Sequence, residues 1–287
     1  MVTLYTALVR TVTGNDQHPH TIFLFSVQNV IFCGQYLFWK QEKGYTMSSA
    51  VYLRTLGYIA TIILHVGNML LMGAPKPKEA ADDVRLQIFA SLQARYLTVW
   101  TFTLQVIFAI SGLMCDCLTL KNSKTKGYRL PKYLKGFRDT LFAAIIWPSV
   151  LVVSTTFWPL FYYDRSLVFP EFLDKVVTSQ SNHVMHTIIV PLAVWEVLFQ
   201  PRTTPKSHLR NVLHIFFHFG LYLAVLFYTF IEKDLWLYPI LDKIYGTVYF
   251  YVFIGAVFVN SLLFYSLQWP ITEIFWGKTK KTMKKKN

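Results

Sequence analysis

The chain has 287 residues, of which 54% are hydrophobic and only 15% are charged. An average soluble domain has about 25% charged residues, so this composition argues against an ordinary soluble globular protein. The formal net charge of +13 comes from lysine and arginine runs beside apolar segments, a pattern typical of membrane topology rather than of a nucleic-acid-binding face.

The apolar residues fall into blocks long enough to cross a bilayer. A spanning helix needs ~20 mostly apolar residues, because the hydrocarbon offers the backbone no water. The first block, 21–39, is the weakest because it contains Gln28, Asn29 and Gln35. The other blocks are 51–73, 96–118, 140–163, 184–200, 210–231 and 245–268. We therefore predict an all-α fold, a polytopic transmembrane bundle of six to seven spanning helices.

The blocks divide the chain into three regions. Residues 1–50 form an N-terminal extension that holds the extra block, residues 51–270 form one transmembrane domain, and residues 271–287 form a basic cytoplasmic tail. The last four residues, Lys284 to Asn287, resemble a dilysine retrieval signal and favour the endoplasmic reticulum. The alternative, that these lysines only anchor the last helix at an anionic leaflet, stays open.

The charge of the connectors alternates along the chain. Seven basic residues and no acidic residue lie between Lys121 and Arg138, and the tail is rich in lysine. The connectors near residues 173 and 238 are acidic. The positive-inside rule then places the loops near 45, 128 and 205 and the C-terminus in the cytosol. The loops near 85, 173 and 238 are expected on the opposite side.

Two histidines mark the start of the fifth block. His183 and His186 are spaced i, i+3, which puts them on one helical face, and they follow Asn182. One interpretation is that a histidine here acts as a general base near the membrane interface. The other is an interfacial pair whose hydrogen bonds are satisfied by water and loop carbonyls.

Thr98 lies one turn into the third block. The loops before the third and fifth blocks share a side of the membrane, so Thr98 and His186 enter from the same face at a similar depth. A hydroxyl and an imidazole that meet are the minimum for nucleophilic ester hydrolysis, since the base takes the proton as the oxygen attacks the acyl carbon. The alternative is a threonine bonded to its own helix backbone.

Other groups on this side could support such a site. Asp164 and Asp174 could orient the imidazole, and Asn182 and His183 are closer to it in sequence. From its position near the interface, Arg165 is hypothesised to bind a substrate carboxylate.

A different kind of site is suggested by the sixth block. His214 and His218, spaced i, i+4, could hold a metal ion or a haem edge and would then indicate an oxidoreductase. Structural hydrogen bonding is the alternative for this pair. Glu196, in the fifth block, is expected to pair with Arg202 or with His214.

Several blocks of sequence resemble one known family. They are Leu53-Arg54, Tyr96-Leu97-Thr98, Phe137-Arg138-Asp139, Phe157-Trp158, Tyr163-Asp164-Arg165, Phe169-Pro170, Leu173-Asp174, Asn182-His183-Val184-Met185-His186-Thr187, Pro191, Glu196 and Trp236 with Tyr238-Pro239. In this order over about residues 51–270, the chain resembles the androgen-induced gene 1-like membrane proteins. The family has glycines shortly before its Tyr-Leu-Thr block, where this chain has 90–95, and residues 1–50 match nothing in it.

The resemblance implies an activity. Members are integral membrane hydrolases of fatty acid esters of hydroxy fatty acids, and they use a threonine nucleophile and a histidine. Carried over by position, these are Thr98 and His186, with a lipid ester as partner and with no metal or cofactor. A non-enzymatic scaffold or receptor that binds lipid in the same pocket is the alternative.

Overall fold

The computed structural model describes residues 47–75 and 77–285, and no β-strand occurs in these ranges. The predicted all-α bundle is confirmed. Within the described ranges, six helical segments are long and apolar enough to span a membrane: Ala50–Gly73, Leu97–Lys121, Lys132–Leu167, Ser179–Phe199, Leu209–Lys233 and Val248–Trp276. The predicted block 21–39 and the end of the tail, residues 286–287, lie outside the described residues.

The first two described spans pack against each other more extensively than any other pair of described elements. They are α3 (Met47–Gly73) and α6 (Leu97–Lys121). Gly112 of α6 faces the Tyr58 ring of α3, and an added Cβ would lie only 2.4 Å from that ring. Arg54 and Asp116 form a buried ion pair between the same helices. The glycine and the ion pair together fix α6, which carries Thr98, against α3.

A buried polar network closes the end of the bundle that holds the basic connectors. The Arg202 guanidinium donates to Glu196 Oε1 at 2.6 Å, and the Tyr58 hydroxyl donates to Glu196 Oε2 at 2.7 Å. The predicted pairing of Glu196 with Arg202 is therefore confirmed. Arg54 also donates to the carbonyl of Phe199, at the end of the fifth block.

The fourth span is longer than its apolar block. It comprises α7 (Lys132–Thr140), the π-helical turn η2 (Leu141–Ile146), α8 (Trp147–Asp164) and the short η3 (Arg165–Leu167). Its helix therefore begins at Lys132 and not at the predicted residue 140. The basic residues of α7 hid this start, because hydropathy registers apolar residues and not helical geometry.

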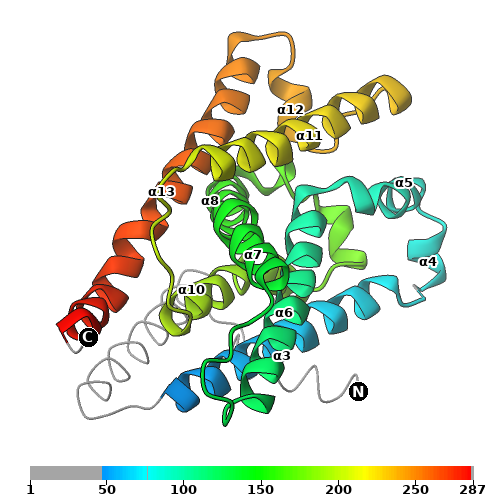
Figure 1. Cartoon of the computed structure of the whole chain (residues 1–287). Helices are drawn as coiled ribbons and strands as arrows, with labels where there is room; N and C mark the ends of the chain where they lie inside the picture. The colour runs from blue at the N-terminus through cyan, green and yellow to red at the C-terminus, as the bar shows by residue number, and fades with distance from the viewer. Residues whose placement is uncertain (1–46, 76, 286–287) are drawn as a thin grey trace.

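The last helix, α13 (Val248–Lys285), packs along α8 and continues without interruption through residue 270. Trp147 Nε1 donates to the carbonyl of Phe264 at 2.8 Å and joins these two helices. The predicted boundary between domain and tail thus falls inside one helix. Figure 1 shows α13 leaving the bundle on the side away from α4 and α5.

The three acidic or balanced connectors gather at the other end. They contain α4 (Lys78–Ala81), α5 (Val84–Leu92), η1 (Gln93–Arg95), η4 (Glu171–Lys175) and α12 (Pro239–Ile244). Lys175 pairs with Asp83 at 3.3 Å, and Lys243 pairs with Asp164 at 3.5 Å. The loops near 85, 173 and 238 therefore lie at one end of the molecule, as the alternation of charge predicts (Figure 1).

Candidate active site

Thr98 stands at the beginning of α6. Tyr96 has an extended backbone (φ −78°, ψ 135°) and caps the helix, so Leu97 and Thr98 are its first two residues. The first α6 amide that bonds back along the chain is that of Trp100, which donates to the Tyr96 carbonyl at 3.2 Å. Thr101, one turn later, donates its hydroxyl to the Leu97 carbonyl, whereas the Thr98 hydroxyl faces another helix.

His186 is the last residue of α9 (Ser179–His186). The Thr178 hydroxyl caps the start of α9 by accepting from Ser181 N–H at 3.1 Å. The helix is then interrupted at Thr187, and the next helix, α10 (Ile189–Phe199), follows after this turn. Pro191 explains the break, because it has no N–H to donate to the Thr187 carbonyl. The imidazole therefore projects from the end of a helix and not from its middle.

The two helix ends bring these side chains together. Thr98 Oγ1 lies 3.3 Å from His186 Nε2, across 88 positions in the sequence. This distance is close to that between a nucleophile and its base in an enzyme without substrate, where such bonds are often loose. The proximity expected from the shared side of the two preceding loops is present.

Asn182 selects the tautomer of His186. Nδ1 of the imidazole lies 3.0 Å from the Asn182 backbone carbonyl and 2.7 Å from the Asn182 Oδ1 atom. Both atoms are acceptors, so Nδ1 carries the proton and donates it. The other ring nitrogen, Nε2, is then an acceptor and is the atom that faces Thr98.

Aromatic rings hold the imidazole in place. The Phe157 ring of α8 stacks on His186 with centroids 3.6 Å apart and planes within 7°. Trp158 donates its indole N–H to the His186 carbonyl at 3.3 Å and stacks on His183. His183 itself pairs through Nδ1 with the Thr187 hydroxyl. His183 therefore lies behind the site and does not contact Thr98.

The predicted acidic supports lie elsewhere. Asp164 accepts from Ser166 N–H and pairs with Lys243, while Asp174 pairs with Arg165 at 2.7 Å. Among the four residues considered for orienting the imidazole, Asn182 alone hydrogen-bonds to the His186 ring in the described structure. Both aspartates form ion pairs with basic residues of the connectors, and neither contacts the imidazole.

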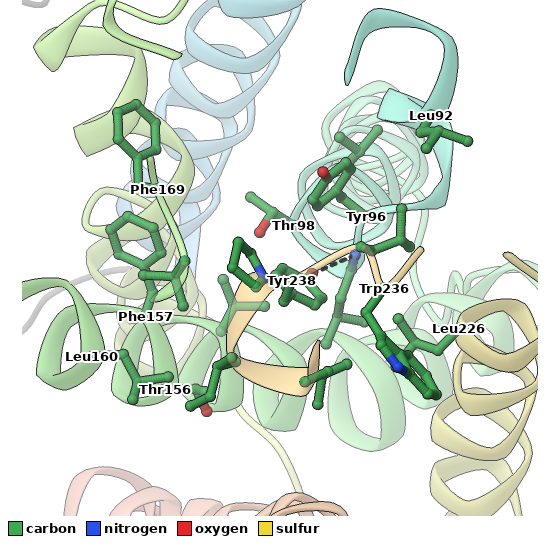
Figure 2. Close-up of a pocket in the computed structure, with 18 of the residues that line it drawn as sticks. Leu92, Tyr96, Thr98, Thr156, Phe157, Leu160, Phe169, Leu226, Trp236 and Tyr238 are labelled. Atoms are coloured by element: carbon green, nitrogen blue, oxygen red, sulfur yellow. Dashed lines mark hydrogen bonds between the residues drawn. The ribbon is translucent and has the colours of Figure 1, made fainter. Parts of the chain in front are cut away.

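A cavity of about 350 Å³ opens in front of Thr98 and His186. Its lining includes Phe157 and Phe169, which belong to one hydrophobic cluster, and Leu226 and Trp236, which belong to another. Figure 2 shows Thr98 between these two groups of side chains. The wall is apolar apart from a few groups, as expected for a site that holds lipid chains.

Arg85 is the charged residue among those that line the cavity. Its guanidinium lies 5.0 Å from the Phe172 ring centroid and donates to Asp83. Hydrogen bonds from Arg85 hold the pKa of the Asp83 carboxyl well below its usual range. Arg165 does not line the cavity: it contacts Asp174 and the Phe169 ring. Its role in binding a substrate carboxylate stays a prediction.

Two tyrosine hydroxyls meet at the start of α6. Leu97 N–H donates to Tyr222 Oη at 3.0 Å and to Tyr238 Oη at 3.3 Å. The Tyr222 hydroxyl donates to Tyr238 Oη at 2.9 Å. Both rings line the cavity, and Tyr238 is shown beside Thr98 in Figure 2. Sequence reasoning missed this pair, because Tyr222 comes from the middle of α11 (Leu209–Lys233) and nothing local links it to Thr98.

The second pair of histidines lies on a different part of the bundle. His214 Nδ1 donates to the Arg210 carbonyl, and His218 Nε2 lies 3.2 Å from the Ser149 hydroxyl. In the described part of the chain, no three His, Cys, Asp or Glu side chains are grouped as metal ligands. His214 and His218 therefore make the structural hydrogen bonds expected from the sequence as the alternative to a metal or haem site.

Comparison with known proteins gives one family. The family model described as FAR-17a/AIG1-like protein matches residues 77–270. The androgen-dependent TFPI-regulating protein of Homo sapiens is 32% identical over 212 residues, 73% of this chain and 89% of that protein. The Mus musculus protein of the same name is 32% identical over 195 residues, 68% of this chain and 82% of that protein. The androgen-induced gene 1 protein of Homo sapiens is 26% identical over 192 residues, 66% of this chain and 79% of that protein. No solved structure matches significantly.

Proposed function

Since this chain belongs to the FAR-17a/AIG1-like family of proteins, we propose that it hydrolyses fatty acid esters of hydroxy fatty acids, with Thr98 as nucleophile and His186 as base. One observation carries the proposal. Thr98 Oγ1 lies 3.3 Å from the unprotonated Nε2 of His186, at the wall of an apolar cavity. A hydroxyl and a base so placed suit acyl transfer.

The residues support a two-step reaction. Thr98 Oγ adds to the ester carbonyl carbon while its proton passes to His186 Nε2, and the carbonyl electron pair moves to oxygen. The intermediate collapses, the bond to the alcohol breaks, and His186 returns the proton to the departing oxygen. A water then attacks the acyl-threonine by the same route, so that the acid leaves and Thr98 regains its proton.

The cavity favours a substrate with two chains. Thr98 lies between a wall that includes Phe157 and Phe169 and a wall that includes Leu226 and Trp236 (Figure 2). An ester placed at Thr98 would extend its acyl chain along one wall and its alcohol chain along the other. Burying CH₂ groups contributes about 0.8 kcal/mol each, so two long chains would supply the binding energy.

A non-enzymatic lipid-binding scaffold or receptor would use the same cavity but would not need the Thr98–His186 contact. A fluorophosphonate probe separates the two functions. We expect the purified protein to be labelled, and the labelling to disappear in Thr98→Ala while Thr101→Ala is labelled normally. Unlabelled wild-type protein that still binds a fatty ester would favour the scaffold.

We also propose residence in the endoplasmic reticulum with a cytoplasmic C-terminus. The proposal rests on the lysines of the tail, three of which precede Asn287. A reporter membrane protein that carries this tail should be retained in the reticulum, and changing Lys284 and Lys285 to serine should release it. Unchanged retention would leave the tail as an anchor only.

A further inference from the structure

We infer that Tyr238 and the N–H groups that open α6 form the oxyanion hole of the site. This inference rests on the proposed function, because an oxyanion arises only if Thr98 attacks an ester. The donors required are groups that lie next to the nucleophile and are already oriented before the reaction.

The tyrosine pair has one proton to spare. Two hydroxyls carry two protons, and their mutual hydrogen bond, from Tyr222 to Tyr238, uses one of them. The third member of the group, Leu97 N–H, is a donor and takes up no proton. In the described part of the chain the Tyr238 proton therefore has no acceptor, and Tyr238 lines the cavity. A ligand oxygen would satisfy this proton.

The backbone offers further donors at the same place. Trp100 N–H is already bonded to Tyr96, and Leu97 N–H is bonded to the tyrosines. The intervening amides, those of Thr98 and Val99, belong to the first turn of α6, where N–H groups have no acceptor within the helix. They point out of the first turn of a 25-residue helix, whose aligned peptide dipoles favour negative charge at this end. Thr98 is thus both the nucleophile and a neighbour of these donors.

The Tyr238 phenol suits the role at neutral pH. Burial raises the pKa of Tyr238, so the phenol keeps its proton. A hydroxyl donor bonds more strongly to an oxyanion than to the neutral carbonyl oxygen of the ester, so its contribution is concentrated in the transition state. The donation from Tyr222 polarises the Tyr238 hydroxyl further.

The test compares two hydrogen-bonded tyrosine hydroxyls. Tyr265, on α13, bonds to His208 and Asn211 and lies outside the cavity wall. Tyr238→Phe should lower kcat by about 10²- to 10³-fold, the range for the loss of one oxyanion donor, with KM nearly unchanged. Tyr265→Phe, which also loses a hydrogen-bonded hydroxyl, should keep the wild-type kcat.

A second readout separates the oxyanion role from simple capping of Leu97. A trifluoromethyl ketone analogue of the substrate forms a tetrahedral adduct with Thr98, whereas an ether analogue mimics only the chains. Tyr238→Phe should weaken binding of the ketone by the factor lost in kcat/KM and leave binding of the ether unchanged. Equal weakening of both analogues, or a wild-type kcat, would overturn the inference.

The unmodified protein provides a further check if Tyr238→Phe does not fold. A thionoester substrate places sulfur where the oxyanion forms and fits the donors poorly, so its kcat should fall well below that of the oxygen ester. Equal rates would contradict an oxyanion hole. Failure of the underlying function looks different, since Thr98→Ala would then still hydrolyse the ester.

Discussion

Asn182 Oδ1 lies 2.7 Å from Nδ1 of His186, one helical turn away on α9. The Asn182 carbonyl accepts from the same nitrogen at 3.0 Å. Two acceptors on one side of the imidazole leave the other side as the base. The Asn182 side chain thus contributes to a tautomer that the helix backbone alone already favours.

This relationship predicts a moderate effect for Asn182→Ala. The backbone carbonyl remains, so only one hydrogen bond of about 1 to 1.5 kcal/mol is lost, which corresponds to roughly a tenfold fall in kcat. Asp164→Ala is the control, because Asp164 pairs with Lys243 outside the site. The kcat of ester hydrolysis is measured for each purified variant and for the wild type. If Asp164→Ala lowers kcat as much as Asn182→Ala does, Asn182 has no special role in catalysis.

Arg85 and Arg165 are alternative candidates for the residue that binds a substrate carboxylate. Arg85 lines the cavity and Arg165 does not, so Arg85→Ala should raise KM for an ester with a free carboxylate more than for its methyl ester. If Arg165 binds the carboxylate instead, as its position near the interface predicts, Arg165→Ala should show this difference and Arg85→Ala should not. Steady-state kinetics with the two substrates decides between them. Equal effects of Arg165→Ala on both substrates would count against Arg165 as the carboxylate-binding residue.

The buried ion pair between α3 and α6 predicts a stability difference. Arg54→Met leaves Asp116 buried without its partner, and such a loss typically costs about 3–5 kcal/mol. The double variant Arg54→Met with Asp116→Leu removes both charges and should recover most of this stability. Thermal unfolding in detergent compares the three proteins. A double variant as unstable as the single one would mean that packing and not charge is responsible.

The close approach of α3 and α6 predicts that a side chain at position 112 lowers the stability of the protein. A Cβ at this position would lie 2.4 Å from the Tyr58 ring, so Gly112→Ala should destabilise the protein by about 1–3 kcal/mol through overpacking. Gly136→Ala is matched, because a Cβ at that helical position meets nothing within 4 Å. The same unfolding assay should show Gly136→Ala at least as stable as wild type.

Much of the fold followed from the sequence because spanning helices are specified by long apolar blocks. The proximity of Thr98 and His186 was also predictable, since the parity of the connectors puts both at one face. Asn182 was harder to single out. Its i, i+4 spacing to His186 is visible in the sequence, but the apolar block began at residue 184 and left Asn182 in a loop. The helix begins at Ser179 because Thr178 caps it.

The tyrosine pair and the residues that line the cavity could not be predicted in this way. Tyr222 and Tyr238 meet at Leu97 only because α11 packs beside the start of α6. Neither periodicity nor charge encodes that pairing. Arg165 was proposed from its position beside the interface, whereas the place of Arg85 at the cavity depends on the fold of the connector.

The most direct test of the central claim is hydrolysis of a branched fatty acid ester by purified wild-type protein and by Thr98→Ala, Thr98→Ser, His186→Ala and Thr101→Ala. The Thr98–His186 site predicts no hydrolysis above background for Thr98→Ala and His186→Ala, measurable hydrolysis for Thr98→Ser, which keeps a hydroxyl, and wild-type hydrolysis for Thr101→Ala. Undiminished hydrolysis by folded Thr98→Ala would contradict the account.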